Sequence, residues 1–86
     1  MRHKNQDIEY RFGRAIRRRR RELDLSQEEL AERAELHRNY VSGIETGTRN
    51  PSLKNIEKLA KALDISVARL FSDYCVEVEG ESESSS

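Results

Sequence analysis

The 86-residue sequence has few of the features that mark exported, membrane or disulfide-stabilised proteins. Its one cysteine, Cys75, has no partner for an internal disulfide, which fits a reducing cytoplasm. No apolar run approaches the roughly 20 residues that a membrane span needs. The N-terminus is charged and has no apolar signal core, so we do not expect export. These absences predict a cytoplasmic protein without a membrane segment.

The sequence also has none of the residue patterns that we would expect of an enzyme. It has no glycine-rich phosphate loop, no zinc-ligand spacing and no histidine paired with a nucleophile. Its two histidines, His3 and His37, are far from each other and from Cys75, so they do not form a metal-ligand set. We therefore expect no catalysis, no metal and no cofactor.

Size and composition indicate one small helical domain. The chain has a single proline, 35% hydrophobic residues and 37% charged residues, which is typical of a compact helical domain with a charged exterior. A chain of this length buries only about 60–65% of its unfolded surface. Its stability is therefore expected to be marginal, and a partner subunit would help.

The net charge of zero conceals a strong asymmetry along the chain. Residues 72–86 hold five acids and no base. The other 71 residues hold all 16 bases and the remaining 11 acids, so they carry a net charge of +5. A basic body with an acidic end indicates a polyanionic partner.

The most informative stretch is 26–50, which predicts two short helices joined by a tight turn. Ser26 is followed three residues later by Glu29, the spacing of a capping box at a helix start. A second helix is expected from about Arg38 to Glu45, and Gly47 follows it where a helix end favours glycine. Helices of about two turns are not stable alone, so they must share a core with the rest of the chain.

These residues resemble the helix-turn-helix of the lambdoid phage repressor and Cro family, also called the XRE type. The resemblance is carried, over roughly residues 10–72, by Ser26-Gln27, Leu30-Ala31, Val41-Ser42, Ile44-Glu45, Gly47, the run 49–53, Ile56, Leu59-Ala60, Ala62-Leu63 and Leu70-Phe71. The run 38–45 looks most like the controller proteins of restriction–modification systems. The resemblance implies an all-α fold of five helices, a lambda-repressor-like DNA-binding domain that contains the helix-turn-helix.

Apolar periodicity predicts the other three helices, over 9–23, 52–63 and 66–74. In the second of these, Leu53, Ile56, Leu59 and Leu63 share one face. We expect residues 1–8 to form a flexible N-terminal arm, 9–75 the helix-turn-helix DNA-binding domain, and 76–86 an acidic, Ser/Glu-rich disordered tail.

Basic residues in the arm have two interpretations. Arg2, His3 and Lys4 are interpreted first as a frayed terminus and second as a contact with a phosphate backbone.

The resemblance also implies structural roles for three positions. Arg20 and Glu45 are expected to form an ion pair that ties the first helix to the third. At Arg19 the family usually has an apolar residue, so the arginine stem is expected to cover the edge of the core while its head reaches water. At Glu35 family members often have glycine, because the turn uses a positive φ that costs a glutamate about 1 kcal/mol. Either the turn differs slightly here or the fold absorbs the strain.

The DNA contacts are expected on the helix that starts near Arg38 and on the segments beside it. Long donors, amides, hydroxyls and a gap on one helix face suit the reading of base edges. The expected base-reading residues are Arg38, Asn39, Ser42, Gly43 and Thr46, with Gly43 allowing close approach. The expected phosphate-binding residues are Gln27, His37, Tyr40, Arg49 and Asn50. Packing is the first interpretation of Tyr40, and a base contact is a second one for Arg49.

The last helix carries more apolar residues than so small a domain is expected to bury. The surplus predicts a dimer interface, as the family implies. Its expected members are Ile65, Val67, Leu70, Phe71 and Tyr74, of which Leu70 is also the first candidate for the core. The alternative is that all five belong to the core.

We therefore expect a sequence-specific, DNA-binding transcriptional regulator. It would bind a pseudo-palindromic operator in double-stranded DNA as a homodimer, with helix 38–45 in the major groove. Such a protein acts as a repressor or as an activator, and an activator would also contact RNA polymerase. Two alternatives remain: an antitoxin that uses the same fold, and a protein-interaction module that has lost DNA binding. Polar, arginine-bearing recognition residues argue against the module.

Overall fold

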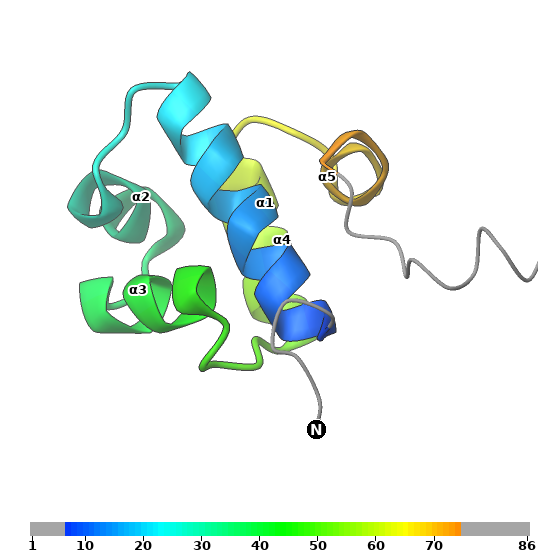
Figure 1. Cartoon of the computed structure of the whole chain (residues 1–86). Coiled ribbons are helices and arrows are strands. Elements are labelled where there is room, and N and C mark those ends of the chain that lie inside the picture. Colours follow the sequence, from blue (N-terminus) through cyan, green and yellow to red (C-terminus); the bar gives the residue numbers. More distant parts are fainter. Residues whose placement is uncertain (1–6, 75–86) are drawn as a thin grey trace, which may run out of the picture.

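The structure is a computed structural model that describes residues 7–74. This part of the chain forms five α-helices and no strand: α1 (Ile8–Glu22), α2 (Gln27–Ala34), α3 (Arg38–Thr46), α4 (Leu53–Ala62) and α5 (Val67–Asp73) (Figure 1). The all-α fold expected from the sequence is confirmed, and each helix boundary lies within one residue of the expected one. The arm residues Arg2, His3 and Lys4 and the tail 76–86 lie outside the described residues. None of the five helices is both long and apolar enough to span a membrane.

The helices pack around one hydrophobic core. α3 packs against α1 and α2, whereas α5 packs against α1 and α4. Figure 1 shows α2 and α3 on one side of α1 and α5 on the other. The largest fully buried apolar side chains are Ile16, Leu30, Val41, Ile44, Leu59, Leu63 and Leu70, and the ring of Phe12 is almost fully buried with them. All five helices therefore contribute to the same core, which explains how helices of two or three turns are stable here.

Leu70 corrects one expectation about the dimer interface. Its side chain is fully buried, because it lies on the face of α5 that packs against α1 and α4. A side chain that is already enclosed in its own subunit has no surface left for a second one. Leu70 therefore belongs to the core and not to a dimer patch.

Serine residues cap the helices that the sequence marks with them. Ser26 accepts a hydrogen bond from the amide of Glu29, and Glu29 accepts one from the amide of Ser26, which completes the expected capping box. Ser52 and Ser66 cap α4 and α5 in the same way, with one bond each. His37 precedes α3 and makes no such bond. The start of α3 is therefore not closed by a side-chain cap.

In the turn between α2 and α3, the backbone of Glu35 is in the left-handed conformation, although this residue is not a glycine. Glu35 ends α2 with φ 60° and ψ 45°. Its amide donates to the carbonyl of Glu32, and the next amide, of Leu36, donates to the carbonyl of Ala31. Of the two alternatives, the turn keeps its positive φ, so the fold bears the conformational cost of a β-carbon at this position.

Arg19 does more than cover the edge of the core. Its Nε donates to the carbonyl of Leu63 at 2.9 Å and its Nη2 to the carbonyl of Asp64 at 3.1 Å. These carbonyls lie at the C-terminal end of α4, where helix carbonyls have no partner inside the helix. The head of Arg19 stays partly exposed, as expected, and it also caps α4, which was not expected.

A glycine that the sequence did not single out sets the distance between α1 and α3. A β-carbon on Gly13 would lie 2.1 Å from the carbonyl oxygen of Ile44 and 2.8 Å from that of Glu45. Both oxygens belong to the backbone of α3, so neither can move aside cheaply. Only a residue without a side chain allows α1 to cross the end of α3 so closely.

One buried carboxylate joins the first three helices. Glu45 of α3 has a fully buried side chain and accepts from Arg20 Nε at 2.6 Å and from Arg20 Nη2 at 3.0 Å. Gln27 Nε2 of α2 donates to it at 3.0 Å, and Arg17 Nε of α1 lies 3.5 Å away. Arg20 also donates through Nη1 to the carbonyl of Leu25, at 2.8 Å. The pair is therefore bidentate, and its remaining bonding capacity is satisfied within the fold.

The surroundings of Glu45 decide its ionisation. Burial by itself raises the pKa of Glu45, but the hydrogen bonds from Arg20, Gln27 and Arg17 and the charge of Arg20 outweigh it. The pKa therefore lies below its ordinary value of 4.5. Since the unfolded chain binds this proton more tightly, the ionised carboxylate contributes stability above pH 4.5 that is lost as the pH falls through the lower folded pKa.

We predict that Arg20 and Glu45 are strongly coupled. Arg20→Ala should lower the free energy of unfolding by about 3–5 kcal/mol, because it leaves a buried charge without its partner. The exposed neighbour Arg21 is a matched control, and Arg21→Ala should change stability by no more than about 0.5 kcal/mol. Urea unfolding of Arg20→Ala, of Glu45→Ala and of the double variant that combines them gives the coupling energy. An additive double variant would mean that the pair contributes nothing of its own.

The pH dependence gives a second prediction. Wild-type stability should decline below pH 4.5 more steeply than that of Glu45→Gln, because only the wild type loses the ionised carboxylate of Glu45. Thermal unfolding between neutral pH and about pH 3 measures the difference. Parallel curves for the two proteins would contradict the lowered pKa.

Removing the strain at Glu35 should stabilise the protein. We expect Glu35→Gly to raise the free energy of unfolding by about 0.5–1 kcal/mol, because glycine adopts the left-handed conformation without the steric cost. Glu32→Gly, inside α2, should instead lower it by about 1 kcal/mol. Urea unfolding measures both, and a destabilised Glu35→Gly would show that the glutamate side chain makes a compensating contribution.

Candidate nucleic-acid interface

One face of α3 is polar and open to solvent. Val41, Ile44 and Glu45 point inward and are buried. Arg38, Asn39 and Thr46 are exposed, and Ser42 and Gly43 are half-buried. The five expected base-reading residues therefore lie on the side of α3 that faces away from the core. This follows from helical periodicity, because the inward and outward residues alternate every three or four positions.

Thr46 uses its hydroxyl within α3. Its Oγ1 lies 3.1 Å from the carbonyl oxygens of Ser42 and Gly43, and 3.2 Å from Oγ1 of Thr48. The hydroxyl proton is therefore engaged at the helix end. The methyl group of Thr46 and the lone pairs of its oxygen remain for an outside partner.

The gap at Gly43 is filled by a side chain of this protein. A β-carbon on Gly43 would lie 2.5 Å from Cγ of Arg49, in the loop after α3. The guanidinium of Arg49 then lies over the ring of Tyr40, 5.5 Å from its centre. The expectation that Gly43 leaves space for DNA is therefore corrected. The space holds the stem of Arg49, which adds a second arginine beside the exposed face of α3.

Tyr40 is oriented by a residue that the sequence analysis missed. Nδ2 of Asn55, in the first turn of α4, donates to the hydroxyl oxygen of Tyr40 at 2.9 Å. This leaves the hydroxyl proton of Tyr40 free to donate to a ligand. The contact joins residues 15 positions apart on different helices, so no local pattern in the sequence points to Asn55.

A shallow polar groove runs beside α3. Its volume is about 440 Å³, and it is lined by His37, Asn39, Tyr40, Arg49 and Asn55, with Glu35 and Leu36 beside them. Three of the expected phosphate-binding residues, His37, Tyr40 and Arg49, are therefore brought together with a base-reading residue. Their donors and the open N-terminus of α3 suit an anionic group.

The other two expected phosphate-binding residues lie elsewhere. Gln27 is half-buried at the start of α2 and donates to Glu45, so its amide serves the buried network. Asn50 is exposed and lines a separate small pocket with Ile8, Pro51 and Phe71. The groove beside α3 thus includes neither Gln27 nor Asn50.

The expected dimer residues divide between the core and the surface. Val67 is exposed, whereas Ile65, Phe71 and Tyr74 are partly buried. The ring of Phe71 lies 5.6 Å from that of Phe12 in α1. The hydroxyl of Tyr74 donates to Glu22 of α1.

Leu53 extends this apolar surface onto α4. Periodicity groups it with the buried leucines of that helix, yet 84% of it is exposed, because it lies at the first position of α4, beyond the core. Together with Ile56 and Val67 it lines a pocket of about 440 Å³. The exposed apolar surface is therefore shared by α4 and α5.

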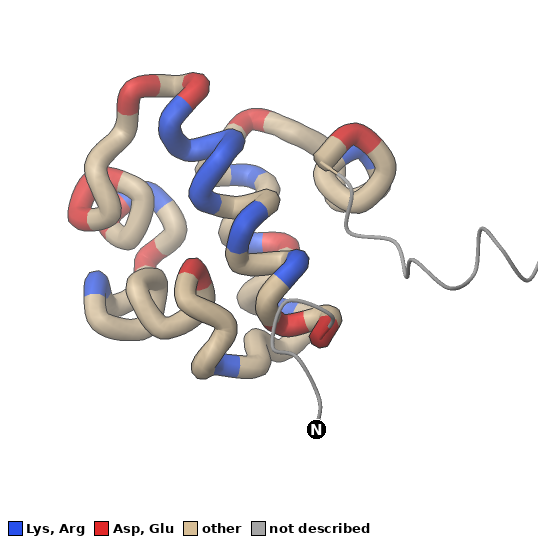
Figure 2. Tube along the Cα trace, viewed as in Figure 1, with Lys and Arg blue, Asp and Glu red and all other residues tan. Residues whose placement is uncertain are grey.

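Charges are unevenly distributed over the helices. Figure 2 shows lysine and arginine concentrated along α1, whereas α2 carries mainly acidic residues. The exposed side of α3 has the arginines Arg38 and Arg49 at its two ends. Within residues 7–74, no cluster of histidine, cysteine or carboxylate side chains is placed to hold a metal ion.

Comparison with known proteins agrees with this geometry. Residues 16–70 match the Helix-turn-helix family. The chain is 48% identical, over 68 residues, to the control protein C.MunI of a Mycoplasma species. This similarity covers 78% of the chain and 92% of C.MunI.

Two solved structures of restriction–modification controller proteins have the same fold. C.AhdI from Aeromonas hydrophila has a TM-score of 0.72 and 51% identity over 73% of this chain and 96% of its own. C.Esp1396I, described as a tetramer in complex with its natural 35-base-pair operator, has a TM-score of 0.73 and 33% identity over 78% of this chain and 88% of its own. The chain thus belongs to the helix-turn-helix family, within which it groups with the restriction–modification control proteins.

Proposed function

We propose that this protein is a transcriptional regulator of the restriction–modification controller type. It binds a pseudo-palindromic operator as a homodimer and inserts α3 into the major groove of each half-site. The observation that carries the proposal is the exposed polar face of α3, held in place by the buried Glu45 network. The operator complex of the similar C.Esp1396I supports double-stranded DNA as the ligand.

The readers of base edges are Arg38 and Asn39. Both are exposed in the first turn of α3, the end of a recognition helix that points into the major groove. Arg38 presents two donors to a guanine, and Asn39 offers a donor and an acceptor to an adenine. Thr46, whose hydroxyl proton is engaged, offers its methyl group, which suits the methyl group of a thymine.

The polar groove beside α3 takes the phosphate backbone. Tyr40 donates its free hydroxyl proton, and its orientation is fixed by Asn55. Arg49 supplies a positive charge next to it, stacked on the Tyr40 ring. Phosphate contacts of this kind fix the register of the helix on the duplex without reading its sequence.

The dimer forms through the apolar surface shared by α4 and α5. Leu53 and Val67 are exposed, and Ile56 lines the same pocket, together with the charged Lys54 and Glu57. An apolar surface of this kind on a small, marginally stable domain favours self-association. A two-fold dimer through this surface would place the two recognition helices about 34 Å apart, one turn of duplex.

The similar proteins favour a regulator over an antitoxin. C.MunI is described as a control protein, and C.AhdI as a restriction–modification controller protein. The sign of regulation at the operator depends on promoter geometry, and an activator would place this protein against RNA polymerase.

Arg38→Ala should identify Arg38 as a reader. We expect it to weaken binding to the cognate operator by about 1–3 kcal/mol and to relax the preference at one base pair. The contrasting variant is Tyr40→Phe, which keeps the packing of the ring and removes only the hydroxyl. It should weaken binding to every sequence by a similar factor, because a phosphate contact reads no base.

The measurement is a titration of both variants against the operator and its single-base changes at fixed salt. A selection of bound sequences from random DNA would first define the operator. If Arg38→Ala lowers the affinity equally for all operator variants, Arg38 is an anchor and the reader assignment fails.

Leu53→Glu and Val67→Glu should each give a folded monomer. A carboxylate in the apolar patch would have to be desolvated in the dimer, whereas in the monomer it remains in water. Leu53 is the sharper test, because a glutamate in the first turn of α4 is also favourable for the helix.

The control for the dimer variants is Arg33→Gln, on the exposed surface of α2. It changes the net charge by the same amount, away from α4 and α5, and should leave the dimer intact. Sedimentation at micromolar concentration reports the mass, and circular dichroism reports the fold. A wild-type protein that sediments as a monomer would remove the basis for the patch.

A further inference from the structure

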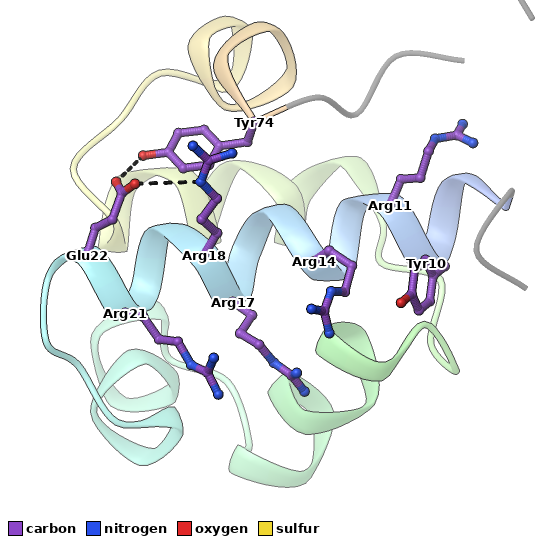
Figure 3. A pocket seen from close by; sticks show the side chains of 8 residues that line it. All are labelled: Tyr10, Arg11, Arg14, Arg17, Arg18, Arg21, Glu22 and Tyr74. Atoms are coloured by element: carbon purple, nitrogen blue, oxygen red, sulfur yellow. Dashed lines mark hydrogen bonds and ion pairs between the residues drawn. The ribbon is translucent and has the colours of Figure 1, made fainter. Parts of the chain in front are cut away.

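A basic groove on α1 is not used by the interface described above. It is open, has a volume of about 580 Å³ and is lined by five arginines of α1, with Tyr10, Glu22 and Tyr74 at its edges. Figure 3 shows Arg14, Arg17 and Arg21 projecting to the same side of α1, and Arg18 beside Tyr74. We call this feature the arginine groove.

The arginine groove concentrates like charges. Arg14, Arg17 and Arg21 are spaced three and four residues apart, so they are neighbours on one helix face and repel one another. Arg19 and Arg20 belong to the same run but serve the fold, at the end of α4 and at Glu45, and Arg17 also lies 3.5 Å from Glu45. In contrast, Arg21 is exposed, and its side chain has no hydrogen bond or ion pair within the described part of the chain; its carbonyl accepts from the amide of Asp24. The groove is therefore suited to an extended anionic ligand.

An anionic segment of this chain starts at the edge of the groove. The residue after Tyr74, which lines the groove, begins the twelve-residue segment 75–86. That segment holds four glutamates and no base. Because it is tethered at the groove, its local concentration there is on the order of millimolar, whatever the concentration of the protein.

The spacing of the acids matches that of the arginines. Glu77, Glu79, Glu81 and Glu83 occupy every second position, so an extended chain would present them all on one side, about 7 Å apart. Arg17 and Arg21 are four residues apart on a helix, which is about 6 Å along its axis. One glutamate repeat therefore fits the spacing of Arg17 and Arg21, whereas Arg14 and Arg17 are closer, about 4.5 Å apart along the axis.

We propose that the acidic segment 75–86 binds in the arginine groove of its own chain. The bound segment neutralises the exposed positive charge of α1. Random duplex DNA is therefore less attracted to these arginines. Specific binding through α3 remains possible, since the groove includes none of the base-reading residues. The alternative ligand is a DNA phosphate backbone, which carries the same kind of charge but is not tethered to the groove.

Nuclear magnetic resonance of the full-length protein tests the contact without DNA. The amide signals of residues 77–83 should shift in Arg14→Gln/Arg21→Gln and should shift in the same direction when salt is raised from about 50 mM to about 500 mM. Reciprocally, replacing all four glutamates by glutamine should shift the Nε–Hε signals of Arg14 and Arg21. The pair Lys54→Gln/Lys61→Gln removes the same charge from the exposed surface of α4 and should leave signals 77–83 unchanged.

The proposal is overturned if the amide signals of residues 77–83 are the same in the wild-type protein and in Arg14→Gln/Arg21→Gln. If, in addition, that double variant loses affinity for random duplex DNA while the lysine pair does not, the groove serves the phosphate backbone instead. If the lysine pair shifts the signals as much as the arginine pair does, the segment responds to overall charge and has no site. None of these outcomes depends on the proposed operator, so failure here leaves the assignment of α3 untouched.

Discussion

The carboxylate of Glu45 is the point on which the arrangement of the first three helices depends. It is fully buried in α3 and receives donors from Arg17 and Arg20 of α1 and from Gln27 of α2. A buried carboxylate without these donors would be very costly, so the three helices are stable together only in the orientation that satisfies it. The buried contacts of Glu45 thereby fix the orientation of α3, and with it the direction in which the exposed face of that helix points.

α1 determines where the recognition surface lies by two further contacts. Gly13 allows α1 to cross against the backbone of Ile44 and Glu45, and Tyr10 packs against Gly47, where the chain turns with φ 82°. That turn leads directly to the loop that carries Arg49. α1 therefore positions both the helix that is proposed to read bases and the loop that is proposed to hold the backbone.

Local features of the fold could be predicted from the sequence, whereas several contacts of the candidate site could not. The Ser26 capping box and the glycine at Gly47 are short-range signals, since the partner atoms lie within a few residues. The pairing of Tyr40 with Asn55 and the stem of Arg49 over Gly43 depend on how separate elements pack. Leu53 was misassigned for a related reason: periodicity defines a helix face, but not how far along the helix the core extends.

The arginine run illustrates how one segment serves two opposite requirements. The side chains of consecutive arginines on a helix point in different directions around its axis, so each of them lies in different surroundings. Arg19 and Arg20 point inward and are bound by carbonyls and by Glu45, where their charge is compensated. Arg18 and Arg21 of the run, and Arg14 one turn before it, are exposed; Glu22 lies 3.8 Å from Arg18, and the charge that remains raises the affinity for any polyanion. A regulator that must find one operator among many random sites gains from screening that second set, because non-specific attraction grows with every uncompensated charge.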